Sequence, residues 1–392
     1  APVGGSGLGY RLLEARVDRV RLVFIDRPEF FDRDGLYLDD SGSEWPDNAW
    51  RYTFFSRAVL DLALSMEPRP RIIHCHDWQT GLVPAYLSTV FSLDRRFENT
   101  ASVFTIHNIG YQGIVPKEFL PLTGLDWSTF TPDGLEFYDR ISFLKSGMVY
   151  CDALTTVSAK YSEEIQTPEF GFGLDGVVRA QKQKLHGILN GADYDRWDPS
   201  TDKSLPANFG PDNLAGKAAC RKALVKEFGL KPGRPVIGMV TRLAAQKGID
   251  ILLGALDRIM ALDVNLVLLG QGDPEMEDSL RWQAGRFEGS LGVKIAFDER
   301  LSRLIEAGSD FFLMPSRYEP SGLNQIYSLR YGTVPIVRAT GGLDDTILDI
   351  EDSPAAGNGF KFLPYNSDAL ADCVERAVRF HRERPEKWKK LL

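Results

Sequence analysis

The second half of the chain alternates short apolar runs with stretches of helical character, and glycine-rich or polar turns separate them. This rhythm predicts a parallel sheet covered by helices, because parallel strands are buried on both faces and read as continuous apolar runs. The predicted strands are residues 235–240, 265–269, 293–297, 310–314 and 334–337. A ligand of such a sheet lies outside the carboxyl ends of its strands, so we expect the strand-to-helix loops to form one site.

The first half repeats this pattern less regularly and predicts a second α/β domain. Its predicted strands are residues 20–25, 72–75, 103–105 and 153–157, and its predicted helices include residues 49–64 and 81–91. Between the halves, residues 198–216 carry three prolines, two glycines and several Asp and Asn, which is typical of a linker. We therefore expect an α/β protein of two Rossmann-like parallel-sheet domains facing across a cleft, residues 1–198 and 199–392, with the boundary near Asp198.

Length and composition agree with this division. At 392 residues the chain is too long for a single core, and its 43% hydrophobic and 26% charged residues are those of an ordinary globular protein. No apolar run approaches the roughly 18 residues that a membrane span needs. A net charge of −8 argues against a nucleic-acid partner, since phosphate backbones require concentrated Lys and Arg.

The four cysteines indicate whether the protein resides in a reducing or an oxidising compartment. They are far apart in the sequence and form no CxxC pair, which argues against a zinc site and against a disulfide framework. The N-terminus shows neither the pattern of a secretory signal nor that of a transit peptide. We therefore expect reduced thiols in a cytoplasm, or in a plastid stroma if the source is a plant or alga.

The loop after the first predicted strand of the second half carries two cations. Arg242 follows the strand, and Lys247 precedes the next helix. Side-chain charge, backbone N–H groups and the helix dipole would all favour the same anion there, which suits a diphosphate. The alternative for this spacing alone is a solvated basic loop.

The later loops add an aromatic ring, a carboxylate and a glycine pair. Phe297 ends the third predicted strand, where its ring could stack on a nucleobase; the alternative is a core phenylalanine. Glu319 follows the fourth strand and can accept hydrogen bonds from sugar hydroxyls or balance charge at an anomeric carbon, while Gly322 leaves room for a close ligand. The pair Gly341-Gly342 offers backbone N–H groups to phosphate oxygens. Because all these loops converge on one edge of the sheet, they predict a nucleotide-sugar site.

The sequence resembles the glycogen and starch synthases over residues 20–380. In the second half the resemblance is carried by residues 241–248, 310–330 (DFFLMPSRYEPSGLNQIYSLR) and 332–346 (GTVPIVRATGGLDDT). In the first half it is carried, in the family's order, by residues 74–80 (HCHDWQT), 104–113 (FTIHNIGYQG), 155–159 and 187–197 (GILNGADYDRW). The general glycosyltransferase pattern has a second Glu eight positions after Glu319. Tyr327 stands there, a departure typical of the synthases.

The resemblance implies a GT-B fold and a retaining enzyme that transfers glucose from ADP-glucose to the nonreducing 4-hydroxyl of an α-1,4-glucan. It implies that Arg242 and Lys247 hold the donor diphosphate and that Glu319 and His107 flank the glucosyl unit. His107 has the alternative of a satisfied polar residue beside a strand end. The implied donor-binding residues are Phe297, which would stack on the base, with Gly322, Leu323, Thr340, Gly341 and Gly342. The implied sugar-side residues of the opposite lobe are Asp77, Gln79 and Asn190. No residue is an obvious nucleophile for a double displacement, so a same-face mechanism is the family-level expectation.

Two Asp-x-Asp sequences, residues 32–34 and 193–195, match a pattern that chelates a divalent cation in other glycosyltransferases. Neither follows a strand of the predicted nucleotide site, and Arg242 and Lys247 already supply positive charge there. We expect these residues to be loop or capping aspartates, with no metal and no cofactor besides the substrate.

The resemblance weakens at both ends of the chain. The family begins with a Lys-x-Gly-Gly-Leu-Gly loop that closes on the donor, whereas residues 1–9 carry the glycines without a preceding Lys, and residues 10–25 resemble a later strand pair. The chain also stops before the family's last segment. We therefore expect an incomplete first domain, and the alternative function is a donor- or glucan-binding fragment with impaired catalysis. A transferase for small sugars, of the sucrose or trehalose type, is disfavoured by Tyr327. The choice between ADP-glucose and UDP-glucose, glycogen or starch, primer length and oligomeric state stay open.

Overall fold

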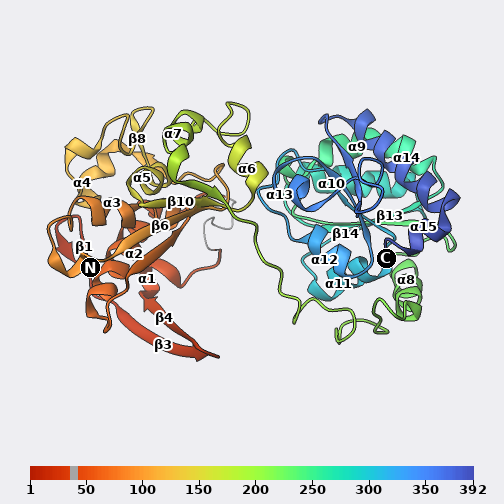
Figure 1. The fold of residues 1–392 in the computed structure, drawn as a ribbon, viewed down its shortest axis with the longest axis horizontal. Helices are drawn as coiled ribbons and strands as arrows, with labels where there is room; N and C mark the ends of the chain where they lie inside the picture. The colour runs from red at the N-terminus through yellow and green to blue at the C-terminus, as the bar shows by residue number, and fades with distance from the viewer. Residues whose placement is uncertain (36–42) are drawn as a thin grey trace. The chain divides into compact units, whose positions relative to one another are not determined.

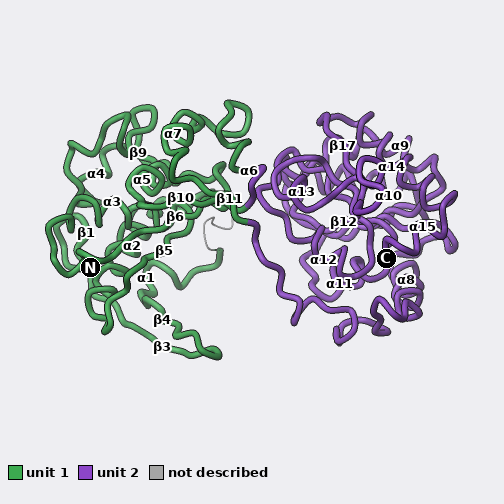
Figure 2. Tube along the Cα trace, in the orientation of Figure 1, with its two compact units in different colours: residues 1–157, 162–188 green, residues 158–161, 189–392 purple. Residues whose placement is uncertain are grey.

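The computed structural model describes residues 1–35 and 43–392, and the chain divides into two compact units (Figures 1 and 2). Unit 1 comprises residues 1–157 and 162–188, and unit 2 comprises residues 158–161 and 189–392. Each unit is built on a parallel sheet, as the apolar runs predict. The predicted boundary near Asp198 lies ten residues inside unit 2, because the main division falls after Ile188.

The sheet of unit 2 has six parallel strands in the order β14-β13-β12-β15-β16-β17. They are β12 (Val236–Val240), β13 (Asn265–Gly270), β14 (Leu291–Ile295), β15 (Phe311–Met314), β16 (Val334–Arg338) and β17 (Phe360–Phe362). Numbered along the chain, this is the doubly wound order 3-2-1-4-5-6. The chain direction across the sheet reverses between β12 and β15, so their loops diverge and leave room for a ligand.

Helices cover both faces of this sheet because its strands bury alternate side chains on opposite sides (Figure 1). Phe311 and Leu313 pack with α9, α10 and α14, whereas Phe312 packs with α8 and α11. The helices are α8 (Ala215–Glu227), α9 (Ile249–Met260), α10 (Pro274–Arg286), α11 (Glu299–Gly308), α12 (Asn324–Arg330), α13 (Gly341–Thr346), α14 (Ser367–Glu383) and α15 (Pro385–Lys389). Asp273, Asp298 and Asn366 cap three of them with side-chain oxygens, as expected for these residue types.

Residues 198–216 do not form a free linker. Leu205 and Phe209 are buried against α8 and α11, and the Asp202 carboxylate lies beside Arg303 of α11. The proline and glycine content therefore produces an irregular backbone. The apolar and acidic side chains of this segment pack on unit 2 and form an ion pair with it.

Unit 1 contains a four-stranded parallel sheet in the order β11-β10-β6-β5. Its strands are β5 (Ile72–His76), β6 (Ala101–Ile106), β10 (Ala153–Thr156) and β11 (Leu185–Gly187). Its helices are α1 (Pro28–Phe31), α2 (Asn48–Ser65), α3 (Leu82–Ser88), α4 (Leu120–Thr123), α5 (Phe143–Tyr150) and α7 (Asp175–Ala180), and α6 (Ala159–Glu164) straddles the unit division. Gly147 of α5 packs directly on the buried ring of Phe104, since a Cβ there would lie 2.3 Å from the ring. This close approach sets α5 against β6.

The remaining strands of unit 1 are antiparallel. They form the pairs β1 (Pro2–Val3) with β2 (Ser6–Gly7) and β3 (Arg11–Val17) with β4 (Val20–Asp26), and a small sheet of β7 (Ile114–Pro116), β8 (Glu136–Phe137) and β9 (Arg140–Ser142). The predicted strand at residues 20–25 is therefore β4 of an exposed hairpin and, in the described part of the chain, pairs with β3 alone. Charged side chains along β3, with cross-strand pairs such as Arg11 with Asp26, suit a solvated hairpin better than a buried parallel strand.

Two further features of the structure concern the cysteine thiols and the apolar length of the helices. All four cysteines are buried and free. None of the helices in the described ranges is long and apolar enough to cross a bilayer.

Candidate active site

Arg242, Lys247 and Glu319 lie at the carboxyl end of the unit 2 sheet, on the loops that follow β12 and β15. These loops flank the reversal of chain direction, which is where open α/β sheets bind ligands. Lys247 ends the short 3-10 helix η6 (Ala245–Lys247). The structure therefore brings together three residues that are 77 positions apart at most in the sequence.

Backbone contacts fix the two loops against each other. The Arg317 N–H donates to Gln246 O at 2.8 Å, and Gln246 Nε2 donates to Tyr318 O at 3.1 Å. Gly248 has a φ of 74°, and a Cβ there would lie 2.0 Å from Pro315 O. Only glycine allows this approach, so the loop carrying Lys247 is held against the loop carrying Glu319.

Lys247 and Glu319 form a half-buried ion pair. Lys247 Nζ donates to Glu319 Oε2 at 2.6 Å, and Ser316 Oγ donates to the same oxygen at 3.0 Å. The Glu319 residue is only 7% exposed. No described residue donates to Oε1, so the carboxylate is held firmly by one oxygen while the other remains available to a ligand hydroxyl.

Two adjoining cavities lie at this edge of the sheet. The smaller, about 210 Å³, is lined by Lys247, Glu319, Gly322 and Leu323 among others. The larger, about 680 Å³, extends toward the loop after β14. Both are also lined by Val240, Thr241, Arg242 and Asn324. Arg242 therefore stands where a polar, charged cavity meets a larger one, an arrangement that suits a phosphate between a sugar and a nucleoside.

Phe297 lines the larger cavity and is 86% exposed. Strand β14 ends at Ile295, two residues earlier than predicted, so Phe297 belongs to the loop and is not a core side chain. An exposed aromatic ring at a cavity wall provides a stacking surface for a base. Trp197 lines the same cavity and is stacked on Tyr327 with ring centroids 4.2 Å apart.

The glycine pair lies against the loop that carries Glu319, and an N–H group of the pair is bonded within the protein. The Gly342 N–H donates to Glu319 O at 3.1 Å and to Pro320 O at 3.2 Å, so it is engaged within the protein. A Cβ on Gly341 would lie 2.0 Å from Glu319 O. Gly341 and Gly342 are buried against the Glu319 loop, Thr340 beside them is also buried, and neither cavity is lined by any of the three. They support the loop that carries the carboxylate.

Unit 1 brings Asp77 and His107 together at the ends of β5 and β6. Asp77 Oδ1 accepts the His107 N–H at 2.8 Å. Burial raises the pKa of Asp77, and the hydrogen bonds from the His107 and Asn108 backbone partly offset this. Asp77 has a φ of 54° and a ψ of −174°, a strained backbone for a residue with a side chain. Such strain, about 1–3 kcal/mol, is common at functional sites. Gln79 lies in the next turn, η1 (Trp78–Thr80).

His76 is a candidate that the sequence reasoning missed. Its Nδ1 lies 2.9 Å from His107 Nε2, and burial together with the neighbouring His74 and His107 lowers its pKa. A neutral His76 can therefore fix the orientation of the His107 ring. The signal was present in the sequence, because His74 and His76 alternate along a strand and so lie on one face.

The remaining predicted residues fall elsewhere. Asn190 follows β11 in the part of the chain that belongs to unit 2, so it is not on the same unit as Asp77 and Gln79. The carboxylate of Asp193 accepts the backbone N–H groups of Asp195 and Arg196, as a capping aspartate does. Within residues 1–35 and 43–392, no three His, Cys, Asp or Glu side chains form a group suited to a metal ion.

Comparison with known proteins bears on both units. A family model described as the starch synthase catalytic domain matches residues 2–180, and one described as glycosyl transferases group 1 matches residues 221–390. Glycogen synthase of Koribacter versatilis is 48% identical over 96% of this chain and 77% of its own length. Glycogen synthase of Myxococcus xanthus is 48% identical over 95% of this chain and 78% of its own length.

Solved structures give the same grouping. The catalytic domain of starch synthase IV from Arabidopsis thaliana, bound to ADP and acarbose, matches with a TM-score of 0.90 and 34% identity, over 100% of this chain and 81% of that one. Sucrose-phosphate synthase from Thermosynechococcus elongatus matches with a TM-score of 0.57 and 19% identity, over 89% of this chain and 75% of that one, which is a likeness of fold alone. The likeness in fold is that of two-domain GT-B glycosyltransferases.

Proposed function

Because the chain belongs to the family of glycogen and starch synthases, we propose that it transfers glucose from ADP-glucose to the nonreducing end of an α-1,4-glucan with retention of configuration. The observation that carries this proposal is the Lys247–Glu319 pair at the floor of the smaller cavity, beside Arg242 at the junction with the larger one. A positively charged junction between a sugar-sized and a nucleoside-sized cavity is what a nucleoside diphosphate sugar requires.

Each charged group has a task in this reaction. Cleavage of the anomeric C–O bond leaves negative charge on the diphosphate, and Arg242 and Lys247 stabilise that charge. Glu319, fixed through Oε2, offers Oε1 to a hydroxyl of the glucosyl unit and balances positive charge at the anomeric carbon. Since two cations serve the leaving group, the proposal assigns no metal. Transfer should therefore be unaffected by EDTA.

Unit 1 supplies the sugar-side groups in this proposal. The Asp77 carboxylate accepts the backbone N–H of His107, and His76 fixes the orientation of the His107 ring, whose remaining nitrogen we assign to a hydrogen bond with the glucosyl unit. Gln79 adds an amide from the following turn. Asn190 and Leu323 remain sugar-pocket and donor-binding candidates, and the exposed ring of Phe297 stacks on the base.

The test is transfer of labelled glucose to glycogen by the 392-residue chain, with ADP-glucose and UDP-glucose in parallel. We expect incorporation from ADP-glucose and a loss of about 100-fold or more for Glu319→Ala, since the carboxylate acts on charge that develops in the transition state. The matched control is Glu288→Ala, an exposed residue that lines neither cavity.

The comparisons do not favour the alternative of a binding fragment with impaired catalysis, but the same assay examines it. If the wild-type chain binds ADP and incorporates no glucose, the synthase proposal is wrong and the fragment alternative stands. A third outcome, transfer to small sugars and not to glycogen, would point to the sucrose- or trehalose-type reading.

A further inference from the structure

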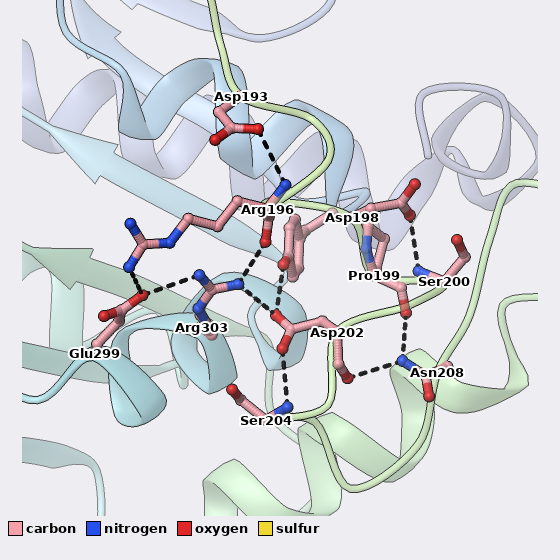
Figure 3. Close-up of polar contacts among 11 residues, drawn as sticks. Asp193, Arg196, Asp198, Pro199, Ser200, Asp202, Ser204, Asn208, Glu299 and Arg303 are labelled. Atoms are coloured by element: carbon pink, nitrogen blue, oxygen red, sulfur yellow. Dashed lines mark hydrogen bonds and ion pairs between the residues drawn. The ribbon is translucent and has the colours of Figure 1, made fainter. Parts of the chain in front are cut away.

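Glu299, at the start of α11, is a carboxylate that the proposed reaction leaves without a task. It lines the larger cavity together with Arg196 and Trp197. Arg196 donates to Glu299 Oε1 at 2.6 Å, and Arg303 donates to the same atom at 2.9 Å (Figure 3). No described residue donates to Oε2. One oxygen is therefore fixed by two guanidinium groups, and the other is free to accept a hydrogen bond from a ligand.

The groups that hold Glu299 are themselves fixed. Arg303 is buried, donates to Arg196 O at 2.7 Å and to Asp202 Oδ2 at 3.0 Å, and lies over the Trp197 ring at 4.4 Å. Asp202 also accepts the Tyr331 O–H at 2.7 Å. The hydrogen bonds from Arg303 and Arg196 lower the pKa of Glu299, so its carboxylate is ionised near neutral pH. A rigid, charged acceptor at a cavity wall is prepared for a donor group on a ligand.

Asp298 is the other carboxylate of this cavity, and its position is explained without a ligand. Its Oδ1 accepts the Leu301 N–H at 2.8 Å and caps α11. That bond turns the Asp298 carboxylate toward the first turn of the helix, whereas Glu299 is drawn toward Arg196 and Arg303. Glu299 is thus the better acceptor for a ligand in the cavity.

A nucleoside between a stacked base and a diphosphate presents the hydroxyls of its ribose to the cavity wall. Carboxylates bind ribose hydroxyls in other doubly wound sheets, because an ionised oxygen accepts a strong hydrogen bond from an O–H donor. We propose that Glu299 Oε2 accepts a hydrogen bond from a ribose hydroxyl of the donor nucleotide, while Arg196 and Arg303 position the carboxylate. This inference rests on the proposed ADP-glucose site and adds the residue that recognises its ribose.

Calorimetric titration of the full chain with ADP, 2′-deoxy-ADP and 3′-deoxy-ADP tests the inference. We expect the wild-type chain to bind ADP roughly ten- to a hundredfold more tightly than the analogue lacking the contacted hydroxyl, the usual effect of a hydrogen bond to a charged group. In E299A this preference should fall to about unity, and in E299Q, which keeps an uncharged acceptor of the same size, it should fall partway. Each preference is the ratio of the dissociation constants of a deoxy analogue and of ADP for the same variant. A change that weakens the binding of all three nucleotides equally therefore leaves this ratio unchanged.

Two variants serve as controls. Glu227→Gln removes a carboxylate that is paired with Lys294 and lies outside the cavity, and Asp298→Asn alters the capping carboxylate beside Glu299. Both should keep the wild-type preference for ADP. If E299A weakens ADP and its deoxy analogues by the same factor, Glu299 is only structural and the inference is wrong. It is also wrong if Asp298→Asn, and not E299A, abolishes the preference. Failure of the wild-type chain to bind ADP would overturn the proposed function as well.

Discussion

Gly341 decides the position of the catalytic carboxylate candidate because it lies directly under the Glu319 backbone. Its φ is 45°, and a Cβ would lie 2.0 Å from Glu319 O. We expect Gly341→Ala to lower the free energy of unfolding by about 2–5 kcal/mol, through backbone strain and the steric conflict. Glucosyl transfer should fall by at least about tenfold, since displacement of a catalytic group by roughly 1 Å can cost a hundredfold.

Gly285 provides the control for this prediction. It lies on the exposed face of α10, and no atom lies within 4 Å of the Cβ that alanine would add. Gly285→Ala should leave transfer unchanged and stabilise the helix by up to about 1 kcal/mol. Urea unfolding and steady-state assays measure both effects. Unaltered transfer in a folded Gly341→Ala variant would show that the pair does not position Glu319.

For single residues, the sequence predicts which side chains gather at the site better than it predicts which groups each of them contacts. Glu319, Arg242 and Lys247 were predicted as a group because strand ends of a parallel sheet meet at one edge. The use of the Gly342 N–H inside the protein could not be read from the sequence, since it depends on the path of a loop 22 to 23 residues away. The His76–His107 contact joins the last residue of β5 to the residue that follows β6, and its detection needed the β5–β6 register in addition to the alternation along β5.

Among the elements, α8 is attached to α11 and to the loop before β16 by a buried lysine. Lys217 Nζ donates to Ala307 O, Tyr331 O and Thr333 Oγ1 at 2.7–3.0 Å. Burial lowers the pKa of Lys217 from near 10.5 to about 8. Between these values the unfolded chain binds a proton that the folded chain has released, so the free energy of unfolding rises with pH across this window.

The prediction compares the wild-type chain with Lys217→Met, which cannot titrate. The stability of the wild type relative to this variant should increase by at most about 3 kcal/mol between pH 8 and 10.5, the linkage expected for the lowered pKa. Urea unfolding at several pH values gives the difference, and the comparison removes titrations that the two proteins share. Parallel stability curves would mean that Lys217 has an ordinary pKa in the folded chain.

Residues 198–216 depend on a buried carboxylate for their attachment to unit 2. Asp202 accepts hydrogen bonds from Arg303, Tyr331 and the Ser204 N–H, and these contacts lower its pKa although burial alone would raise it. Asp202→Ala leaves the buried Arg303 without this partner, so the free energy of unfolding should fall by about 3 kcal/mol in urea titrations. Asp212→Ala, an exposed change in the same segment, should stay within about 0.5 kcal/mol. Equal stabilities of the two variants would contradict the proposed attachment.

The sequence pattern predicts the strands of unit 2 better than it predicts the packing of residues 198–216. Five of the six strands of the unit 2 sheet were predicted within a few residues because burial on both faces demands unbroken apolar runs, whereas the short edge strand β17 was not predicted. The proline, glycine and aspartate content of residues 198–216 correctly indicates an irregular path, but composition does not say where that path packs. Leu205 and Phe209 were the available signal, since apolar side chains in a polar segment need a surface to cover them.

For the whole molecule, the candidate site residues are divided between the units. Both cavities of the donor site are lined only by residues of unit 2, whereas Asp77 and His107 belong to unit 1. ADP binding should therefore be a property of unit 2, and glucosyl transfer a property of the full chain. Residues 158–161, which also belong to unit 2, line neither cavity, so residues 189–392 carry the complete set of cavity residues.

We expect residues 189–392, expressed alone, to bind ADP with about the affinity of the full chain, because both cavities and the cations between them belong to one sheet edge. Transfer to glycogen should be undetectable, since Asp77 and His107 are missing. Lys247→Ala in the same fragment is the control and should weaken ADP binding by roughly tenfold, the contribution of a charge-assisted phosphate contact. Titration calorimetry, with circular dichroism to verify folding, measures these effects. A folded fragment that fails to bind ADP, beside a full chain that binds it, would show that unit 1 contributes to the nucleotide site itself.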